Sequence, residues 1–492
     1  MTTRLPLLLL LAALSACAHR TSFRCEARGG ASWSEYRSRH FIVDTDAKPA
    51  RAARLVELLE TLQLLDLKAL AGSDLDLPGR LRVVALADAA DFRQLAPSWT
   101  DAYFTLGRFG EPTIVIQLDV VDSNREVLAH ELAHYVSRYL FPIQPLWFAE
   151  GLAEFVQTLA APTPRPERPA TGSHLARNAK VPPHSVGRIP ADLQRWSPLI
   201  RPTPAAKLLA WRSGEDADVP GLEHASAWLL YHWLWNQRSP QLTDFEKRLM
   251  DGDMPEQAWR AVFPQYDAAH PEALEALDSE LDRYRRSMHF ASYAVEGTAD
   301  ATFVEAPFPP AEAHLLLTSV RWNWPASPDA RGSLVEAEMA EALREDPRNP
   351  VAVSYAPDAA KRDLQQIRAA AAQAPGDWRA WLLVSSFVEG AEKEAALRRA
   401  VQLNPDNATA QNALAWLLVT SDRTPEALPI ANRALDLAPW NPAIVDTLAE
   451  VAARLGQCPE ALRLEARAVA MRPADESLRK RQAEVQKRCP PG

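Results

Sequence analysis

The hydrophobic pattern of the first part of the chain predicts short strands alternating with helices. Residues 38–45 alternate polar and apolar side chains, and residues 81–86 and 113–118 are short apolar runs. Both patterns are typical of β-strands. Leucines recur at helical spacing over residues 49–70, and a short helix is expected over residues 88–96. This order, followed by further helices, predicts a small α+β unit.

Two helices are expected next. Ser123 followed by Glu126 has the form of a capping box, which predicts a helix that begins near residue 124. It should end at about Leu140, because Pro142 follows. A second helix is predicted from near Pro145, since proline suits the first turn of a helix.

The middle of the chain is less regular. Residues 161–205 are rich in proline and are expected to form a long loop. Residues 222–236 predict a helix, and residues 242–290 predict two or three more. The irregular stretch 291–330 is interpreted as a junction between domains.

The C-terminal part repeats itself. Pro405, Pro439 and Pro473 follow related residue pairs and lie 34 residues apart (439 − 405 and 473 − 439). Alanines recur at the same interval, where small side chains let paired helices pack closely. The period resembles the tetratricopeptide repeat and predicts an all-α solenoid over residues 331–490. An ordinary helical bundle with accidental spacing is the alternative.

The N-terminus has the pattern of an export signal. Arg4 precedes an apolar run, and small residues follow that run. The apolar run is too short to span a bilayer. Leu14-Ser15-Ala16-Cys17 resembles the lipobox of bacterial lipoproteins, which implies a signal over 1–16, a lipid on Cys17 and a tether over 17–35. Cleavage after Ala18 is the alternative. Either hypothesis places the chain outside the cytoplasm. Ala18 follows the cysteine, where an Asp would suggest retention in the inner membrane, so the periplasmic side of the outer membrane is favoured.

Composition and cysteines limit the remaining classes. The 492 residues carry 54 basic and 63 acidic side chains, a net charge of −9, which argues against general nucleic-acid binding. Export implies an oxidising compartment, in which Cys458 and Cys489 could pair and leave Cys25 odd. The sequence alone does not decide this pairing.

The motif that carries chemistry is His130-Glu131-Leu132-Ala133-His134. On a helix, residues four apart share a face, so both imidazoles can reach one metal ion. Glu131 can then approach a water on that ion without being a ligand. The alternative is that these are two histidines of the surface or core.

A third ligand is expected from the second helix. If that helix returns past the first, Glu150 lies beside the two histidines, and two histidines with a glutamate and an open position are typical of catalytic zinc. Glu154 lies one turn further and is predicted to hydrogen-bond the far nitrogen of a ligand histidine. For Glu154 a solvated carboxylate is the alternative.

On these residues, segment 124–155 resembles gluzincin metallopeptidases, most closely the peptidase-MA-like domain of exported bacterial proteins. Trp147-x-x-Glu150-Gly151 resembles a zinc-binding segment of the aminopeptidase-N family. Weaker similarity extends over about 33–290, which implies a zincin-like domain over 36–290. No G-x-M-E-N segment is present, so recognition of a free amino terminus is not implied.

The resemblance implies a mechanism with one zinc ion that activates water and Glu131 as general base. Strand 113–118 is expected to bind an extended substrate along its edge. The oxyanion donor is expected to be His224 or Tyr231, which share a helix face with Trp228. A core aromatic stripe is the alternative.

Two functions therefore remain. The first is a membrane-anchored zinc peptidase, expected to be an endopeptidase, whose repeats recruit a peptide substrate or protein partner. The second is a repeat scaffold with a structural or vestigial metal site. Glu131 discriminates between them, because a scaffold needs no general base.

Overall fold

The computed structural model describes residues 26, 30–72, 75–96, 100–160, 184–190, 193, 201–212, 221–267, 269–287, 290–322, 328–354 and 364–490. The expected signal, Cys17, Cys25 and much of the expected loop 161–205 lie outside these residues.

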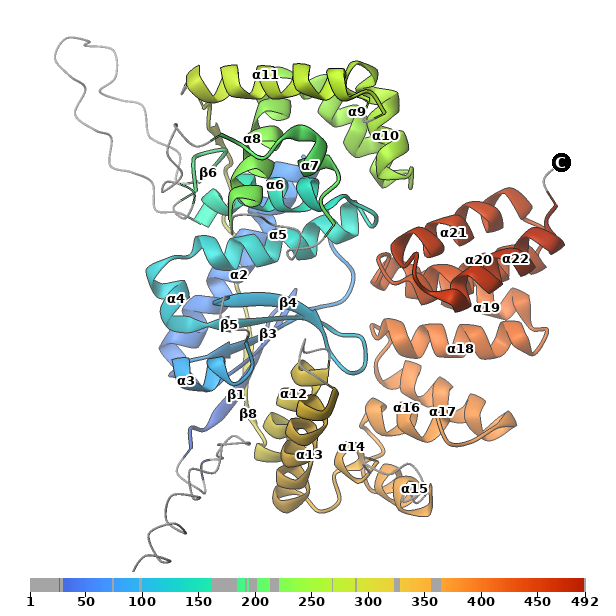
Figure 1. The fold of residues 1–492 in the computed structure, drawn as a ribbon. Helices are drawn as coiled ribbons and strands as arrows, with labels where there is room; N and C mark the ends of the chain where they lie inside the picture. The colour runs from blue at the N-terminus through green and yellow to red at the C-terminus, as the bar shows by residue number, and fades with distance from the viewer. Residues whose placement is uncertain are drawn as a thin grey trace, which may run out of the picture.

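A six-stranded mixed sheet organises the N-terminal domain (Figure 1). Its strands are β1 (Trp33–Arg37), β2 (Phe41–Thr45), β3 (Leu81–Leu86), β4 (Ala102–Leu106), β5 (Pro112–Gln117) and β8 (Val304–Phe308). The order is β4-β5-β3-β2-β1-β8, in which β2, β3 and β5 are parallel to one another and the other three strands are antiparallel to their neighbours.

Helices cover both faces of this sheet. Leu81, Val83 and Ala85 of β3 face the larger core, formed with α2 (Pro49–Ala71), α5 (Glu126–Leu140), α6 (Leu146–Val156) and α8 (Leu222–Gln237). Val84 and Leu86 face a smaller core with α3 (Ala89–Arg93) and α12 (Pro310–Trp322). Burial on both faces explains why β3 is apolar at every position except Arg82, rather than alternating.

The remaining elements surround these layers. They are α4 (Leu118–Ser123), η2 (Gln157–Ala160), β6 (Ser185–Val186), α7 (Ala205–Leu209), α9 (Ser239–Met250), α10 (Pro255–Val262), η5 (Pro264–Tyr266), α11 (Pro271–Ser287), β7 (Tyr293–Ala294) and α13 (Pro328–Glu345).

Three sequence expectations are wrong. Ser123 is not a capping residue: it ends α4, its hydroxyl donates to the carbonyls of Asp119 and Val120, and α5 begins at Glu126. Strand 113–118 is not an edge, because β4 lies outside it. The stretch 291–330 is not merely a junction, since β8 pairs with β1 and α12 packs on the sheet. β8 is almost wholly exposed, so it shows no alternating pattern.

The C-terminal part is a stack of antiparallel helix pairs, which confirms the predicted all-α repeat region. The helices are α14 (Pro350–Val353), α15 (Leu364–Gln373), α16 (Trp378–Ser385), α17 (Gly390–Leu403), α18 (Ala408–Thr420), α19 (Thr424–Leu437), α20 (Pro442–Arg454), α21 (Cys458–Met471) and α22 (Glu476–Arg488). Cys458 and Cys489 form a disulfide that ties α21 to the end of α22. No helix in the described ranges combines the length and apolarity needed to cross a bilayer.

The same side-chain cap opens successive repeats. Asn407, Asn441 and Asp475 stand two residues after the periodic prolines, and each accepts hydrogen bonds from backbone N–H groups of the first turn of α18, α20 or α22. Such caps satisfy N–H groups that have no partner within the helix. The helix caps therefore recur every 34 residues, as the packing positions do.

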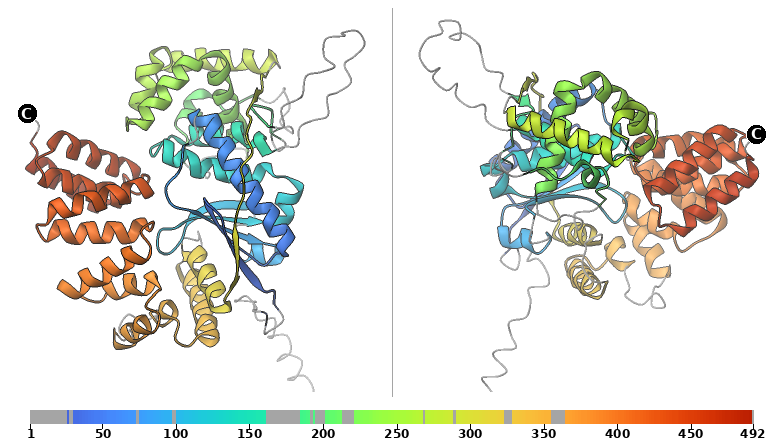
Figure 2. Two further views of the ribbon diagram at one scale, coloured as in Figure 1. Left: turned by 180° about the vertical axis from the view of Figure 1, so that it is seen from behind. Right: turned by 45° about the horizontal axis from the view of Figure 1, so that its top comes forward.

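The stack is fastened to the N-terminal domain at several points (Figure 2). The Tyr139 hydroxyl on α5 donates to the Leu437 carbonyl oxygen at 2.9 Å, and its ring lies 4.6 Å from the Trp440 ring. Near the β4–β5 turn, Asn407 donates to the Phe109 carbonyl oxygen at 3.1 Å. The repeats therefore form a fixed neighbour of α5 and of the β4–β5 turn.

We expect Asn441→Ala to lower the free energy of unfolding by about 1 kcal/mol, because the first turn of α20 loses its cap. Chemical denaturation followed by circular dichroism measures this change. Asn441→Ser retains a capping oxygen and should stay close to the unchanged protein. Equal losses in both variants would contradict the capping role.

Candidate metal centre

Two helices bring the candidate ligands together. His130 and His134 lie one turn apart on α5, and Glu150 lies on α6, which returns past α5 after the turn at residues 141–145. A Cβ atom on Gly151 would lie 2.5 Å from the Ala227 carbonyl oxygen, so only glycine lets α6 approach α8 this closely. The close approach sets the position of the neighbouring Glu150.

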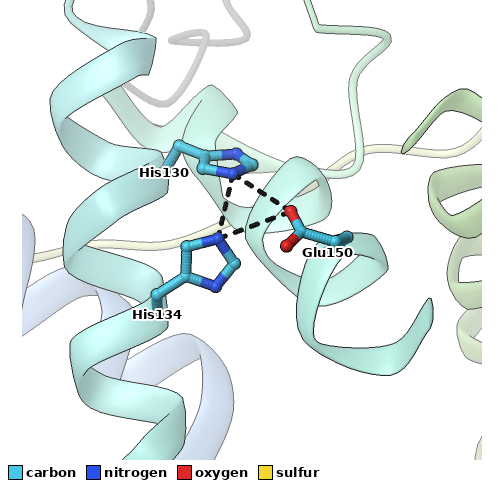
Figure 3. A group of neighbouring side chains, drawn as sticks. All are labelled: His130, His134 and Glu150. Atoms are coloured by element: carbon cyan, nitrogen blue, oxygen red, sulfur yellow. Dashed lines mark hydrogen bonds and ion pairs between the residues drawn. The ribbon is translucent and has the colours of Figure 1, made fainter. Parts of the chain in front are cut away.

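The three side chains point toward one another (Figure 3). Glu150 Oε2 lies 3.4 Å from Nε2 of His130 and 3.4 Å from Nε2 of His134, and the two Nε2 atoms are 3.1 Å apart. All three side chains are mostly buried, with exposed fractions of 14–16%. Among the His, Cys, Asp and Glu residues of the described ranges, these three form the group whose ligand atoms lie close enough together to hold a metal ion.

The spacing fits a tetrahedral zinc ion. Zinc binds histidine nitrogen and carboxylate oxygen at about 2.0–2.1 Å, and ligand atoms at tetrahedral corners are then about 3.3–3.4 Å apart. The observed separations of 3.1, 3.4 and 3.4 Å match this geometry. The donor set of two imidazoles and one carboxylate is also the one that zinc accepts in hydrolytic sites.

Electrostatics at the site favour a cation. Burial would lower the pKa of His130, but the carboxylates of Glu150, Glu154 and Glu131 outweigh it and raise that pKa to about 10. Burial likewise acts to raise the pKa of Glu150, yet His134, His130 and His224 hold it well below its ordinary value. The negative potential that favours a proton on His130 would equally favour a divalent metal ion.

A hydrogen-bond relay orients His130. The Gln157 side chain donates from Nε2 to Glu154 Oε2 at 2.5 Å, and its Oε1 lies 3.1 Å from His130 Nδ1. A carboxylate only accepts hydrogen bonds, so the amide oxygen must face the ring and His130 Nδ1–H must donate to it. This leaves the Nε2 lone pair directed at the other two ligands. Glu154 thus supports His130 through Gln157, where a direct bond was predicted.

Glu131 lies beside the ligands without being one. Its side chain is partly exposed, and its charge acts on both His130 and Arg138. In the ranges that the structure describes, the Glu131 carboxylate has no hydrogen bond or ion pair. A carboxylate in this state can accept a proton from a water molecule.

His224 reaches the same centre from α8. Its Nε2 atom lies 3.5 Å from Glu150 Oε2, and 38% of the side chain is exposed. The ring packs edge-on against Trp211 at 5.4 Å between centroids. His224 therefore lies at the solvent-exposed side of the site.

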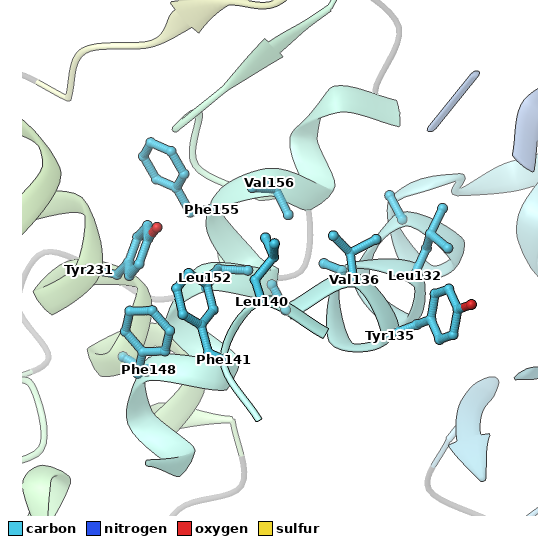
Figure 4. Packing of buried hydrophobic residues seen from close by; sticks show 14 of the residues in the cluster. Leu132, Tyr135, Val136, Leu140, Phe141, Phe148, Leu152, Phe155, Val156 and Tyr231 are labelled. Carbon is cyan, nitrogen blue, oxygen red and sulfur yellow. The ribbon is translucent and has the colours of Figure 1, made fainter. Parts of the chain in front are cut away.

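Tyr231 does not belong to the site, and its prediction as an oxyanion donor is wrong. The side chain is fully buried among Phe148 and Phe155 (Figure 4). Its hydroxyl donates to Glu246 Oε1 at 3.0 Å. Tyr231 lies two helical turns after His224 on α8. At that position its side chain faces the core between α6 and α8.

Sequence reasoning missed three contributors. Gln157 follows Glu154 by three residues, a helical spacing that could have suggested their hydrogen bond. Gly151 was noted only as part of a motif, although it sets the distance between α6 and α8. Trp211 had no signal, because its segment lacks periodicity.

Comparisons with known proteins do not assign this chain to a family. No family model matches it, and no curated protein matches it. Among solved structures, it is similar to a thermophilic TPR protein of Thermus thermophilus, with 21% identity, 36% of this chain and 97% of that chain covered, and a TM-score of 0.27. It is also similar to MamA (41-end) from Desulfovibrio magneticus, with 15% identity, 37% and 87% covered, and a TM-score of 0.20.

We expect Gln157→Leu to weaken zinc binding about 10- to 100-fold, since His130 loses the partner that fixes its ring. Competition with a chromophoric chelator measures the affinity. Gln144→Leu is the matched control, because the Gln144 amide bonds Ser137. Unchanged affinity in Gln157→Leu would contradict the relay.

We expect Glu246→Gln to stabilise the protein more at pH 8 than at pH 5. Burial raises the pKa of Glu246 to about 7 from 4.5, although the Tyr231 hydroxyl lowers it in part. Between these values the unfolded chain loses its proton first, so the stability contributed by neutral Glu246 falls as pH rises to about 7. Thermal melts at both pH values measure the difference.

Glutamine has no such proton to lose, so the advantage of the variant should grow over the same range. The exposed Glu272 supplies a control substitution, Glu272→Gln. An advantage of Glu246→Gln that is equal at both pH values would exclude the raised pKa.

Proposed function

We propose that this protein is a zinc-dependent peptidase, exported and anchored by an N-terminal lipid on the periplasmic side of a bacterial membrane. The observation that carries the proposal is the convergence of His130, His134 and Glu150 at tetrahedral spacing. Glu131, without a partner beside them in the described part of the chain, adds the general base that hydrolysis needs.

The residues have separate roles. A bound zinc ion would supply Lewis-acid polarisation of the attacking water and of the scissile carbonyl. Glu131 takes a proton from that water and returns it to the leaving amine. His224, at the open side, donates a hydrogen bond to the developing oxyanion. Gln157 and Glu154 keep the His130 ring in place.

Strand β4 supports binding of an extended substrate. It ends the described sheet, so its outer edge offers backbone groups for pairing with a peptide. It also packs on the metal-site helix, with Phe104 of β4 lying 6.4 Å from Tyr135 of α5. A peptide added along β4 would therefore pass α5. Pairing with a strand edge uses backbone groups along the peptide and needs no free chain end, which supports an endopeptidase.

The position of the repeats supports a role in presenting substrate. Tyr139, which anchors the stack, lies five residues after His134 on α5. Asn407 of the stack holds the turn that connects β4 to β5. A protein partner or substrate bound by the repeats would thus be held next to the proposed peptide-binding edge.

A repeat scaffold is the second candidate. The regular stack of capped helix pairs favours it, because such surfaces bind proteins without any chemistry. In that case the metal would be structural or vestigial. The two candidates differ in what Glu131 does, since a scaffold keeps its binding when this carboxylate is replaced.

We expect Glu131→Gln to keep about one zinc ion per chain and to lose at least about 99% of peptide hydrolysis, because the base is absent while the ligands remain. His134→Ala should lose both zinc and activity. Metal analysis by mass spectrometry and cleavage of a broad peptide library measure these outcomes.

The exposed His270 supplies the control, His270→Ala, which should retain zinc and activity. Zinc bound by the unchanged protein without hydrolysis of any peptide would favour the scaffold. Hydrolysis that survives in Glu131→Gln would exclude the proposed base.

A further inference from the structure

Arg138 continues the metal-binding face of α5. It lies four residues after His134, so His130, His134 and Arg138 follow one another by successive turns on one side of the helix. Its side chain is exposed. The guanidinium carbon lies 5.0 Å from the centre of the Phe104 ring on β4. Arg138 therefore lies between the metal centre and the edge strand.

In the described part of the chain, the Arg138 guanidinium makes no hydrogen bond or ion pair, and it lies over the Phe104 ring. Desolvation by surrounding protein lowers its pKa, while the negative charges of Glu150 and Glu131 act to raise it. A partly desolvated cation that lacks a partner gains from binding an anion.

Stacking on Phe104 also gives the guanidinium an orientation. A guanidinium held against an aromatic ring keeps its N–H groups available at its edge, and this fork matches a carboxylate. Arg138 could instead only stabilise the C-terminal end of α5 through the helix dipole. In that role, replacing Arg138 would affect peptides with and without a carboxylate equally. A comparison of such peptides therefore distinguishes the two roles.

We propose that Arg138 determines specificity by binding a carboxylate of the peptide substrate, and this rests on the proposed peptidase function. One helical turn places Arg138 about 6 Å along α5 from His134. An extended peptide rises about 3.3 Å per residue, so the carboxylate lies about two residues from the cleaved bond. It is either an Asp or Glu side chain or the C-terminal carboxylate, which present the same chemical group.

The test compares matched peptides with the zinc-loaded full chain. One peptide carries a Glu residue at successive positions, a second carries Gln instead, and each is made with a free or an amidated C-terminus. Arg138→Gln is expected to raise KM for carboxylate-bearing peptides about tenfold or more with little change in kcat. KM for the neutral, amidated peptides should not change.

Two further variants serve as controls. Arg138→Lys keeps a charge at the same place and should restore part of the preference for the carboxylate. Arg125→Gln removes an equal charge from the exposed start of α5 and should leave every KM unchanged. A similar loss on charged and neutral peptides, or no loss in Arg138→Gln, would overturn the proposal.

Product mapping by mass spectrometry separates the two carboxylate sources. Cleavage about two residues from a free C-terminus, abolished by amidation, identifies the terminal carboxylate. Cleavage that follows the Glu residue in amidated peptides identifies the side chain. Cleavage that follows neither would contradict a carboxylate site at Arg138.

The proposal can fail separately from the peptidase function. If the unchanged protein hydrolyses none of these peptides, the peptidase function fails, and binding to zinc-loaded Glu131→Gln is measured by fluorescence anisotropy. Weaker binding of Glu peptides when Arg138→Gln is added then upholds the carboxylate site. Equal binding with and without Arg138→Gln overturns it.

Discussion

The close contact of α6 with α8 at Gly151 is the constraint on which the candidate centre depends. The Ala227 carbonyl oxygen occupies the space that any side chain at Gly151 would need. Because α6 can approach α8 this far, Glu150 meets two histidines from α5 and one from α8. An aromatic core, where Tyr231 packs on Phe148 and Phe155, lies beneath this arrangement.

Helix α5, which carries the two candidate histidine ligands, joins the N-terminal domain to the repeat stack. Its ligands face Glu150, the ring of its Tyr135 contacts Phe104 of the edge strand, and Tyr139 is bonded to the repeats. Two sides of this helix are thus in use, one by the candidate ligands and one by Tyr135 and Tyr139, whose rings contact each other. The repeat stack is consequently a part of the surroundings of the candidate centre and of the β4–β5 turn.

Local sequence patterns predicted the strands that are buried on both faces of the sheet. They missed the strands that are more exposed. β3 was found at its observed limits, because its apolar run is short and contains two valines, which favours a buried strand. β1 and β4 are short and mixed in character, and exposed β8 is recognisable only by its pairing with β1. Pairing between distant segments leaves no local signal in a single sequence.

The candidate site shows the same division. The spacing of His130 and His134 and the return of a second helix to bring Glu150 were visible from helical geometry. The different surroundings of His224 and Tyr231 were not visible from the sequence. Both residues share one helix face by spacing, but His224 lies beside Glu150 and Tyr231 lies in the core. The spacing of Gln157 from Glu154 could have suggested the bond between them, but its contact with His130 depends on where α6 ends and η2 begins.

A crystal structure of the zinc-loaded protein, with anomalous data recorded on both sides of the zinc edge, tests the central claim most directly. The account predicts one anomalous peak about 2.0–2.1 Å from Nε2 of His130, Nε2 of His134 and a carboxylate oxygen of Glu150, with a fourth position open to solvent. The absence of a peak there, or a protein side chain in the fourth position, would contradict it.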